Sequence, residues 1–297
     1  MTQAAIDPLI TKPTGRTSSK RRAKDGAAWM LSSLSLVVIV GPAVWIIGNV
    51  FERVLRAWHW SVLTEVGSGL AGGLANEILG TLVVVAGVGI LAGTIGILGG
   101  LYLAEYGDSH LGTVLRTSSE VLAGIPSIVL GYVGYVALVV YFHWGYSLGA
   151  GILVLTVMVI PYIAKTTEVS LRQVPTAYRE GAEALGMKNS LVLRMIVIKT
   201  ALPGITTGMI ISTAIALGET APLLYTAGYS QSLPTLSLTH HPVGYLTYAI
   251  WTFYNQPSAT AQQLSFDAAG ILIFAVIILI ILSRIIVSLT QRHSEFT

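Results

Sequence analysis

The sequence predicts an all-α integral membrane protein with six transmembrane helices. Of its 297 residues, 53% are hydrophobic and only 10% are charged, and the mean hydropathy is +0.72. About a quarter of the residues of a soluble domain are charged, so this composition suits a lipid-facing surface and not a water-facing one. Six apolar runs approach or exceed the roughly 20 residues that a helix needs to cross a bilayer. They cover residues 27–51, 78–104, 121–142, 144–164, 200–218 and 268–289.

The first element is a basic tail over residues 1–26, followed by a peripheral transmembrane helix over 27–51. Six Lys and Arg residues crowd the tail immediately before the apolar run. This placement indicates a cytoplasmic segment that contacts anionic lipid. The net charge of +3 is therefore explained by the membrane and does not indicate binding to nucleic acid. The run is too long for the apolar region of a cleavable signal peptide.

Orientation follows from the Lys and Arg residues of the connecting segments. The 165–199 connection contains six of them, whereas the 52–77 connection contains two and the 219–267 connection none. The positive-inside rule therefore places both termini, including the tail over 290–297, and the 165–199 connection in the cytoplasm.

Residues 220–266 contain no Asp, Glu, Lys or Arg. A seventh span is the competing interpretation, but the uninterrupted apolar piece at 245–254 is too short to cross and four prolines divide the rest. We expect an extracytoplasmic cap with a short interfacial helix, its Tyr and Trp side chains at headgroup level.

The second span is rich in glycine. The pairs Gly89/Gly93 and Gly96/Gly100 are each spaced four residues apart, so each shares one helix face and allows another backbone to approach closely. Close helix packing is the favoured interpretation, and a pore-lining role is the alternative.

A short amphipathic helix is predicted over 176–186, between the fourth and fifth spans. Pro175 precedes it, Tyr178, Ala182 and Leu185 recur at helical spacing, and Gly186 suits a left-handed helix end. The alternative is a helix that only lies on the membrane surface. Its small apolar face, with Gly and Ala in the middle, favours docking into a groove of another protein.

These residues resemble the EAA loop of ABC importer permeases, with Glu180-Gly181-Ala182, then Gly186, and Ile196 further on. In that family the loop is a coupling helix that docks into the ATPase subunit. The resemblance implies this role for seven residues: Tyr178, Arg179, Glu180, Gly181, Ala182, Leu185 and Gly186.

Three further strings narrow the resemblance, namely YLAEYG at 102–107, AGIPSIVLG at 123–131 and ALGETAPLL at 216–224. Together they are similar to the A-type (PstA) permeases of phosphate-specific ABC importers, over about residues 76–289. The resemblance implies a five-helix, MetI-like core of type I importers over 76–289. Many members of that family have an arginine where Ile215 stands here.

The resemblance also implies partners. These are a paralogous permease in a heterodimer, two ATPase subunits and an external phosphate-binding protein, in the plasma or inner membrane of a bacterium or archaeon. ATP and Mg²⁺ would bind the ATPase, because the near-match Gly181-x4-Gly186-Met187-Lys188 lacks the spacing and the Ser or Thr of a phosphate-binding loop. We therefore expect no cofactor or metal on this chain and no catalytic residues.

Six residues at membrane borders are candidates for the translocation pathway or gate. Ionisable groups there are costly and often functional. Lys165, beside Thr166, could meet phosphate as a point charge or could extend toward the lipid headgroups. Glu219, beside Thr220, could pair with an arginine of the partner permease, and Pro126 with Ser127 could form a kink or a gate.

The sequence thus predicts the permease subunit of an ATP-driven phosphate importer. One alternative is a permease for another oxyanion, such as sulfate or molybdate. The more distant alternative is a passive channel or secondary carrier, which usually shows inverted repeats or intramembrane acidic residues.

Overall fold

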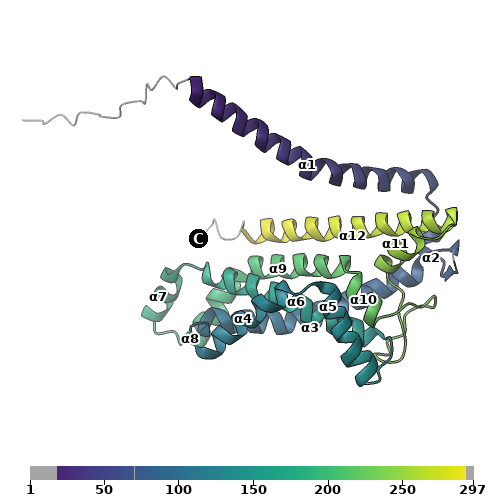
Figure 1. The fold of residues 1–297 in the computed structure, drawn as a ribbon. Helices are drawn as coiled ribbons and strands as arrows, with labels where there is room; N and C mark the ends of the chain where they lie inside the picture. Colours follow the sequence, from purple (N-terminus) through teal and green to yellow (C-terminus); the bar gives the residue numbers. More distant parts are fainter. Residues whose placement is uncertain (1–18, 70, 292–297) are drawn as a thin grey trace, which may run out of the picture. The chain divides into compact units, whose positions relative to one another are not determined.

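Helices make up most of the computed structural model, which describes residues 19–69 and 71–291 (Figure 1). The chain divides between Glu52 and Arg53 into two compact units. In the first unit the described residues belong to a single helix, α1, which contains Pro42 and continues to Ala57. The second unit contains all the other elements.

Most elements follow one another with short connections, and the long exception is the segment 227–245 between α10 and α11. Their bounds are α1 Ser19–Ala57, α2 Ser61–Thr64, β1 Gly67–Ser68, β2 Ala71–Gly72, α3 Ala75–Tyr106, α4 His110–Gly124, α5 Ser127–Gly134, π-helix η1 Tyr135–Tyr141, α6 Leu148–Arg172, α7 Thr176–Ala184, α8 Asn189–Val192, π-helix η2 Leu193–Val197, α9 Ile198–Gly218, α10 Ala221–Thr226, α11 Leu246–Tyr254 and α12 Ala259–Gln291. The two strands form one antiparallel hairpin.

Within the described residues, five helices are long and apolar enough to cross a membrane, and a bent helix pair raises the number to as many as six. The predicted all-α membrane fold is thereby confirmed. The bent pair corrects the third predicted span, which is not one continuous helix over 121–142. Its chain turns by 102° between α4 and α5, at Ile125 and Pro126. Pro126 has no N–H to continue the hydrogen-bond ladder, which explains why α4 ends there.

Several other helices are longer than the apolar runs that predict them. Residues 19–26 of the predicted tail already belong to α1, and residues 1–18 lie outside the described chain. At the other end, α12 runs to Gln291 and so includes residues 290 and 291 of the predicted tail, and residues 292–297 lie outside the described chain. The predicted cap over 220–266 contains α10 and α11, but its last eight residues form the start of α12. Helix α6 continues eight residues beyond the predicted end at 164.

The main core lies where α3 packs on α6, with α9 against both. A side-chain carbon on Gly96 would lie 2.7 Å from Ile163 Cβ, and one on Gly100 would lie 2.5 Å from the carbonyl oxygen of Ala164. Glycine is therefore required at both positions, as the packing interpretation predicts. Gly93 faces Met209 of α9, whereas Gly89 faces open space.

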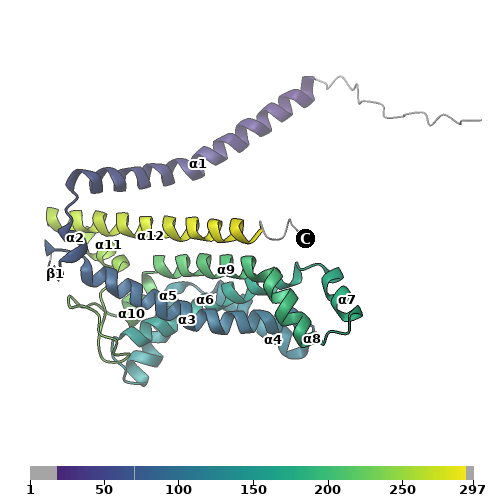
Figure 2. The same cartoon turned by 180° about the vertical axis from the view of Figure 1, so that it is seen from behind.

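A second core joins α2, α11 and α12 around Leu74, and a third joins the end of α6 with α7, η2 and α9. Helix α12 lies along α9 in both views of the ribbon (Figures 1 and 2). The predicted headgroup position is wrong for Tyr245, which is 1% exposed within the main core. Tyr229 and Tyr248 stack with ring centroids 4.1 Å apart, whereas Trp251 and Tyr254 are exposed.

Candidate functional site

Helix α7 coincides with the predicted short amphipathic helix. Pro175 lies just before its first residue, and the chain leaves it through Leu185 and Gly186. Gly186 has φ +74°, the left-handed conformation that ends helices and that glycine adopts without strain. The predicted helix and its glycine end are therefore present.

Most of α7 is exposed. Ala182 is buried in the third core, but Tyr178 is 52% and Leu185 is 83% exposed. Of the three residues predicted to share one apolar face, Ala182 is therefore buried, and Tyr178 and Leu185 are exposed. Glu180 is exposed, and a Cβ added at Gly181 would meet nothing within 4 Å. No contact within the described chain requires Gly181 to lack a side chain.

An ion pair connects α7 to the end of α3. Arg179 donates through Nη1 to Glu105 Oε2 (3.1 Å) and through Nη2 to Glu105 Oε1 (2.6 Å). The hydrogen bonding to Glu105 raises the pKa of the Arg179 guanidinium. This bidentate geometry is the strongest form of an arginine–carboxylate contact.

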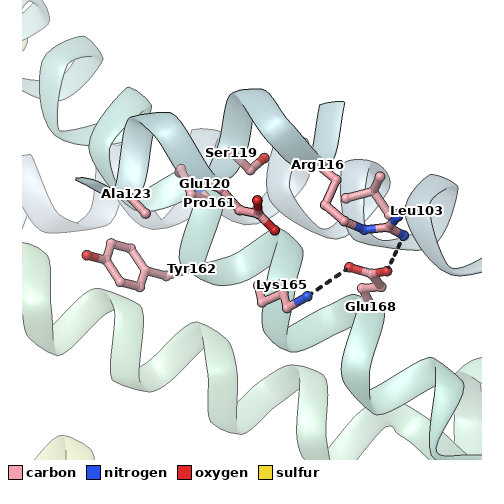
Figure 3. Close-up of a pocket in the computed structure, with 9 residues that line it drawn as sticks. All are labelled: Leu103, Arg116, Ser119, Glu120, Ala123, Pro161, Tyr162, Lys165 and Glu168. Carbon is pink, nitrogen blue, oxygen red and sulfur yellow. Dashed lines mark hydrogen bonds and ion pairs between the residues drawn. The ribbon is translucent and has the colours of Figure 1, made fainter. Parts of the chain in front are cut away.

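A second charged cluster surrounds Glu168 on α6, whose side chain is 4% exposed (Figure 3). Arg116 Nη2 on α4 lies 2.8 Å from Oε1, Arg172 Nε lies 3.3 Å from Oε1, and Lys165 Nζ lies 3.6 Å from Oε2. Arg172 also donates to the carbonyl of Leu103 on α3. Three cations thus surround one carboxylate, and the cluster has a net positive charge.

This cluster borders a cavity of about 240 Å³ between α4 and α6. The walls are formed by Leu103, Arg116, Ser119, Glu120, Ala123, Pro161, Tyr162, Lys165 and Glu168. In Figure 3, Arg116 and Lys165 point toward Glu168 from opposite sides. Glu168 Oε2 has no hydrogen bond, because the ammonium of Lys165 is at ion-pair distance and no closer. Glu168 Oε2 is itself buried and closed to a ligand, whereas the Arg116 and Lys165 side chains remain 30% and 60% exposed and are the groups that an anion could meet.

Two of the six predicted pathway residues, Lys165 and Thr166, lie on α6, and the other four lie at helix breaks. Lys165 lines the cavity, but Thr166 does not: its hydroxyl donates to the carbonyls of Tyr162 (2.9 Å) and Ile163 (3.1 Å), and it abuts Gly208 of α9.

The other four candidates lie at two helix breaks. Pro126 lies between α4 and α5 and Ser127 begins α5, whereas Glu219 and Thr220 separate α9 from α10. At the second break, Thr247 of α11 donates to the Glu219 carbonyl (2.9 Å).

Sequence reasoning missed Arg116, Glu168, Arg172 and Glu105. One signal was available, because Lys165, Glu168 and Arg172 are spaced three and four residues apart and so share a helix face. Arg116 and Glu105 are brought in from distant parts of the chain, and nothing local indicates their partners. Among the described residues, no three His, Cys, Asp or Glu side chains converge as metal ligands would.

Comparison with known proteins gives a consistent result. Residues 96–296 match the family model described as "Binding-protein-dependent transport system inner membrane component". The phosphate transport system permease protein PstA 2 of Mycobacterium bovis is 53% identical over 286 residues, which are 96% of this chain and 95% of that protein. PstA of Yersinia pestis is 31% identical over 94% of this chain and 95% of its own length.

Among solved structures, an inward-facing MetNI methionine ABC transporter matches with a TM-score of 0.59 and 21% identity. The match covers 73% of this chain and 97% of that one. At this level of identity the likeness concerns the fold, and it agrees with the predicted MetI-like core.

Proposed function

The chain belongs to the family of binding-protein-dependent transport system inner membrane components, and from this we propose that it is the transmembrane permease subunit of an ATP-driven importer for inorganic phosphate. The observation that carries the proposal is the 53% identity to a phosphate transport permease over nearly the full length of both chains. An importer of this class depends on a binding protein and an ATPase, and the permease forms the membrane passage.

In this proposal the chain forms half of the pathway together with a paralogous permease, as a heterodimer. An external binding protein delivers phosphate, and two ATPase subunits close when they bind ATP and Mg²⁺ and then hydrolyse the ATP. Both termini and α7 lie on the cytoplasmic side of a bacterial or archaeal plasma membrane, in accordance with the Lys and Arg distribution. The chain itself carries out no covalent chemistry.

Helix α7 is the coupling helix of this proposal. Its exposed Tyr178 and Leu185 offer apolar contacts to the ATPase, and the open space around Gly181 allows another surface to approach. Large apolar side chains that a chain leaves exposed on a short helix are typical of a docking surface.

The cavity beside Glu168 supports phosphate as the cargo. Its cluster of Arg116, Lys165 and Arg172 attracts an oxyanion, and arginine suits phosphate oxygens in particular. At neutral pH phosphate still has a P–OH group, which can donate to an exposed carboxylate of the lining, that of Glu120, whereas sulfate has none. A carboxylate in the cavity therefore favours phosphate over sulfate.

The test is transport by the complete complex in proteoliposomes, with radiolabelled phosphate and sulfate as competing cargoes. We expect ATP-dependent phosphate uptake, and we expect Lys165→Ala to lower uptake more than it lowers co-purification of the ATPase. Equal losses would place Lys165 in the ATPase interface, and preferential sulfate uptake would support the other-oxyanion alternative. Uptake without ATP, with no ATPase bound, would support a channel or secondary carrier.

A further inference from the structure

The ion pair between Arg179 and Glu105 joins residues 74 positions apart in the chain. Both carboxylate oxygens accept from the guanidinium, at 3.1 and 2.6 Å, so the pair fixes orientation as well as distance. The side chains are partly exposed, 32% for Arg179 and 21% for Glu105. A partly exposed pair adds little stability by itself, and its geometric effect is the more important one.

Besides this pair, α7 is attached through Ala182, which belongs to the third core. Its only buried residue is Ala182, and its larger packing contacts are with α8 and η2, which follow directly in the chain. Among the salt bridges found within the described residues, Arg179–Glu105 is the one that links α7 to a helix far away in the sequence. A force on α7 can therefore reach α3 through this pair.

Helix α3 extends from Glu105 across the protein. It packs on α6 backbone to backbone at Gly96 and Gly100. At its opposite end, Asn76 donates to the Ser230 carbonyl (3.2 Å), and Thr81 accepts from the Leu246 amide (2.9 Å). One 32-residue helix thus connects the α7 attachment with the segment between α10 and α12. A chain of packed, rigid contacts of this kind carries energetic coupling between distant sites.

We propose that Glu105 is a positioning residue for transport: with Arg179 it forms the strut through which nucleotide-driven displacement of α7 moves α3 and the far end of the pathway. The inference rests on the proposed function, since it assigns the route by which the ATPase acts on the permease. Glu105 belongs to the YLAEYG string, for which sequence reasoning offered no role.

The first test uses the complete complex in proteoliposomes and measures phosphate imported per ATP hydrolysed. Glu105→Gln keeps the shape of the side chain but removes its charge. We expect a roughly threefold to tenfold fall in this ratio, with ATPase co-purification unchanged, which is the range for losing one well-oriented ion pair. Asp108→Asn is the matched control, because Asp108 is an exposed carboxylate just beyond α3, and it should leave the ratio unchanged.

Exchange of the charges distinguishes a strut from a general packing role. The double variant Glu105→Arg/Arg179→Glu should recover most of the ratio lost in either single variant. An unchanged ratio in Glu105→Gln overturns the proposal. A loss of bound ATPase in proportion to transport also overturns it, because the pair would then serve docking.

A second measurement does not depend on the cargo. The chain has no cysteine, so Tyr106→Cys and Glu183→Cys supply two unique attachment sites for spin labels at the ends of α3 and α7. Glu105→Gln should broaden the distance distribution between the labels, and the charge exchange should narrow it again. If wild-type complex imports no phosphate, the proposed function fails while these distances still decide the strut: an unaltered distribution overturns it.

Discussion

Helix α7 and the segment between α10 and α12 differ in how completely the chain buries them. Both lie outside the long apolar helices, and each contains a tyrosine, Tyr178 in α7 and Tyr245 in the other segment. Yet Tyr178 of α7 is 52% exposed, whereas Tyr245 of the other segment is 1% exposed. The segment after α10 buries Tyr245 and Leu246 in the cores of the chain although Leu236 and Trp251 stay exposed, whereas α7 buries only Ala182 and leaves Tyr178 exposed.

Polar contacts follow the same division. Asn76 and Thr81 of α3 hold the buried segment through its backbone, at Ser230 and Leu246. Helix α7 has a charged attachment at its side and open space at Gly181. The comparison teaches that a charge-free stretch can belong to the core, and that a charged, short helix can be the interaction surface.

The largest effect on stability is expected for Tyr245→Ala. Removal of a fully buried aromatic ring should lower the free energy of unfolding by about 3–5 kcal/mol. Thermal unfolding of the detergent-purified protein measures it. Tyr178→Ala is the matched variant on α7 and should change the same quantity by less than about 0.5 kcal/mol. Equal losses of unfolding free energy in the two variants would contradict the difference in burial between the two regions.

Gly80→Ala should have the next largest effect. A Cβ at Gly80 would collide with the carbonyl oxygen of Gly244 and lie 2.8 Å from Val243 Cγ2. We expect a loss of about 1–3 kcal/mol from overpacking, read from the same unfolding measurement. Gly89→Ala in the same helix meets nothing within 4 Å and should leave stability unchanged or raise it by up to about 1 kcal/mol.

Gly181→Leu should separate stability from function. Because the site is open, the protein should unfold at the wild-type temperature or slightly above it, since leucine favours helix more than glycine by about 0.5–1 kcal/mol. Phosphate uptake should be lost, because the new side chain occupies the space needed by the ATPase. Gly181→Ala should lose less, and wild-type uptake by the leucine variant would remove α7 from the docking surface.

Tyr245→Phe is expected to have the smallest effect. The Tyr245 hydroxyl is buried without a hydrogen-bond partner, and burial raises its pKa above the usual value. Loss of an unsatisfied hydroxyl should change the free energy of unfolding by no more than about 1 kcal/mol, toward greater stability. A loss of several kcal/mol would reveal a polar contact at this position.

The sequence predicted the membrane class, the apolar helices and the short helix α7 with its glycine end, because each depends on local composition or spacing. It left a kink at Pro126 open as one of two interpretations, but it did not predict a bend as large as 102°, since Ile125 and the residues around it remain apolar through the turn. The pairs Glu105–Arg179 and Arg116–Glu168 join residues 74 and 52 positions apart. No single-sequence pattern identifies such partners, because the folded chain alone brings them together.

The π-helix η2 has a mechanical consequence for α9. A π turn contains about one residue more than an α turn, so rewinding Leu193–Val197 as α-helix would rotate everything before it by about 100° relative to α9. The five residues of η2 lie between the α7–α8 segment and α9, where a change in helical winding can take up a rotation of that segment. A change of η2 between π-helix and α-helix would therefore turn the α7–α8 segment while α9 keeps its packing.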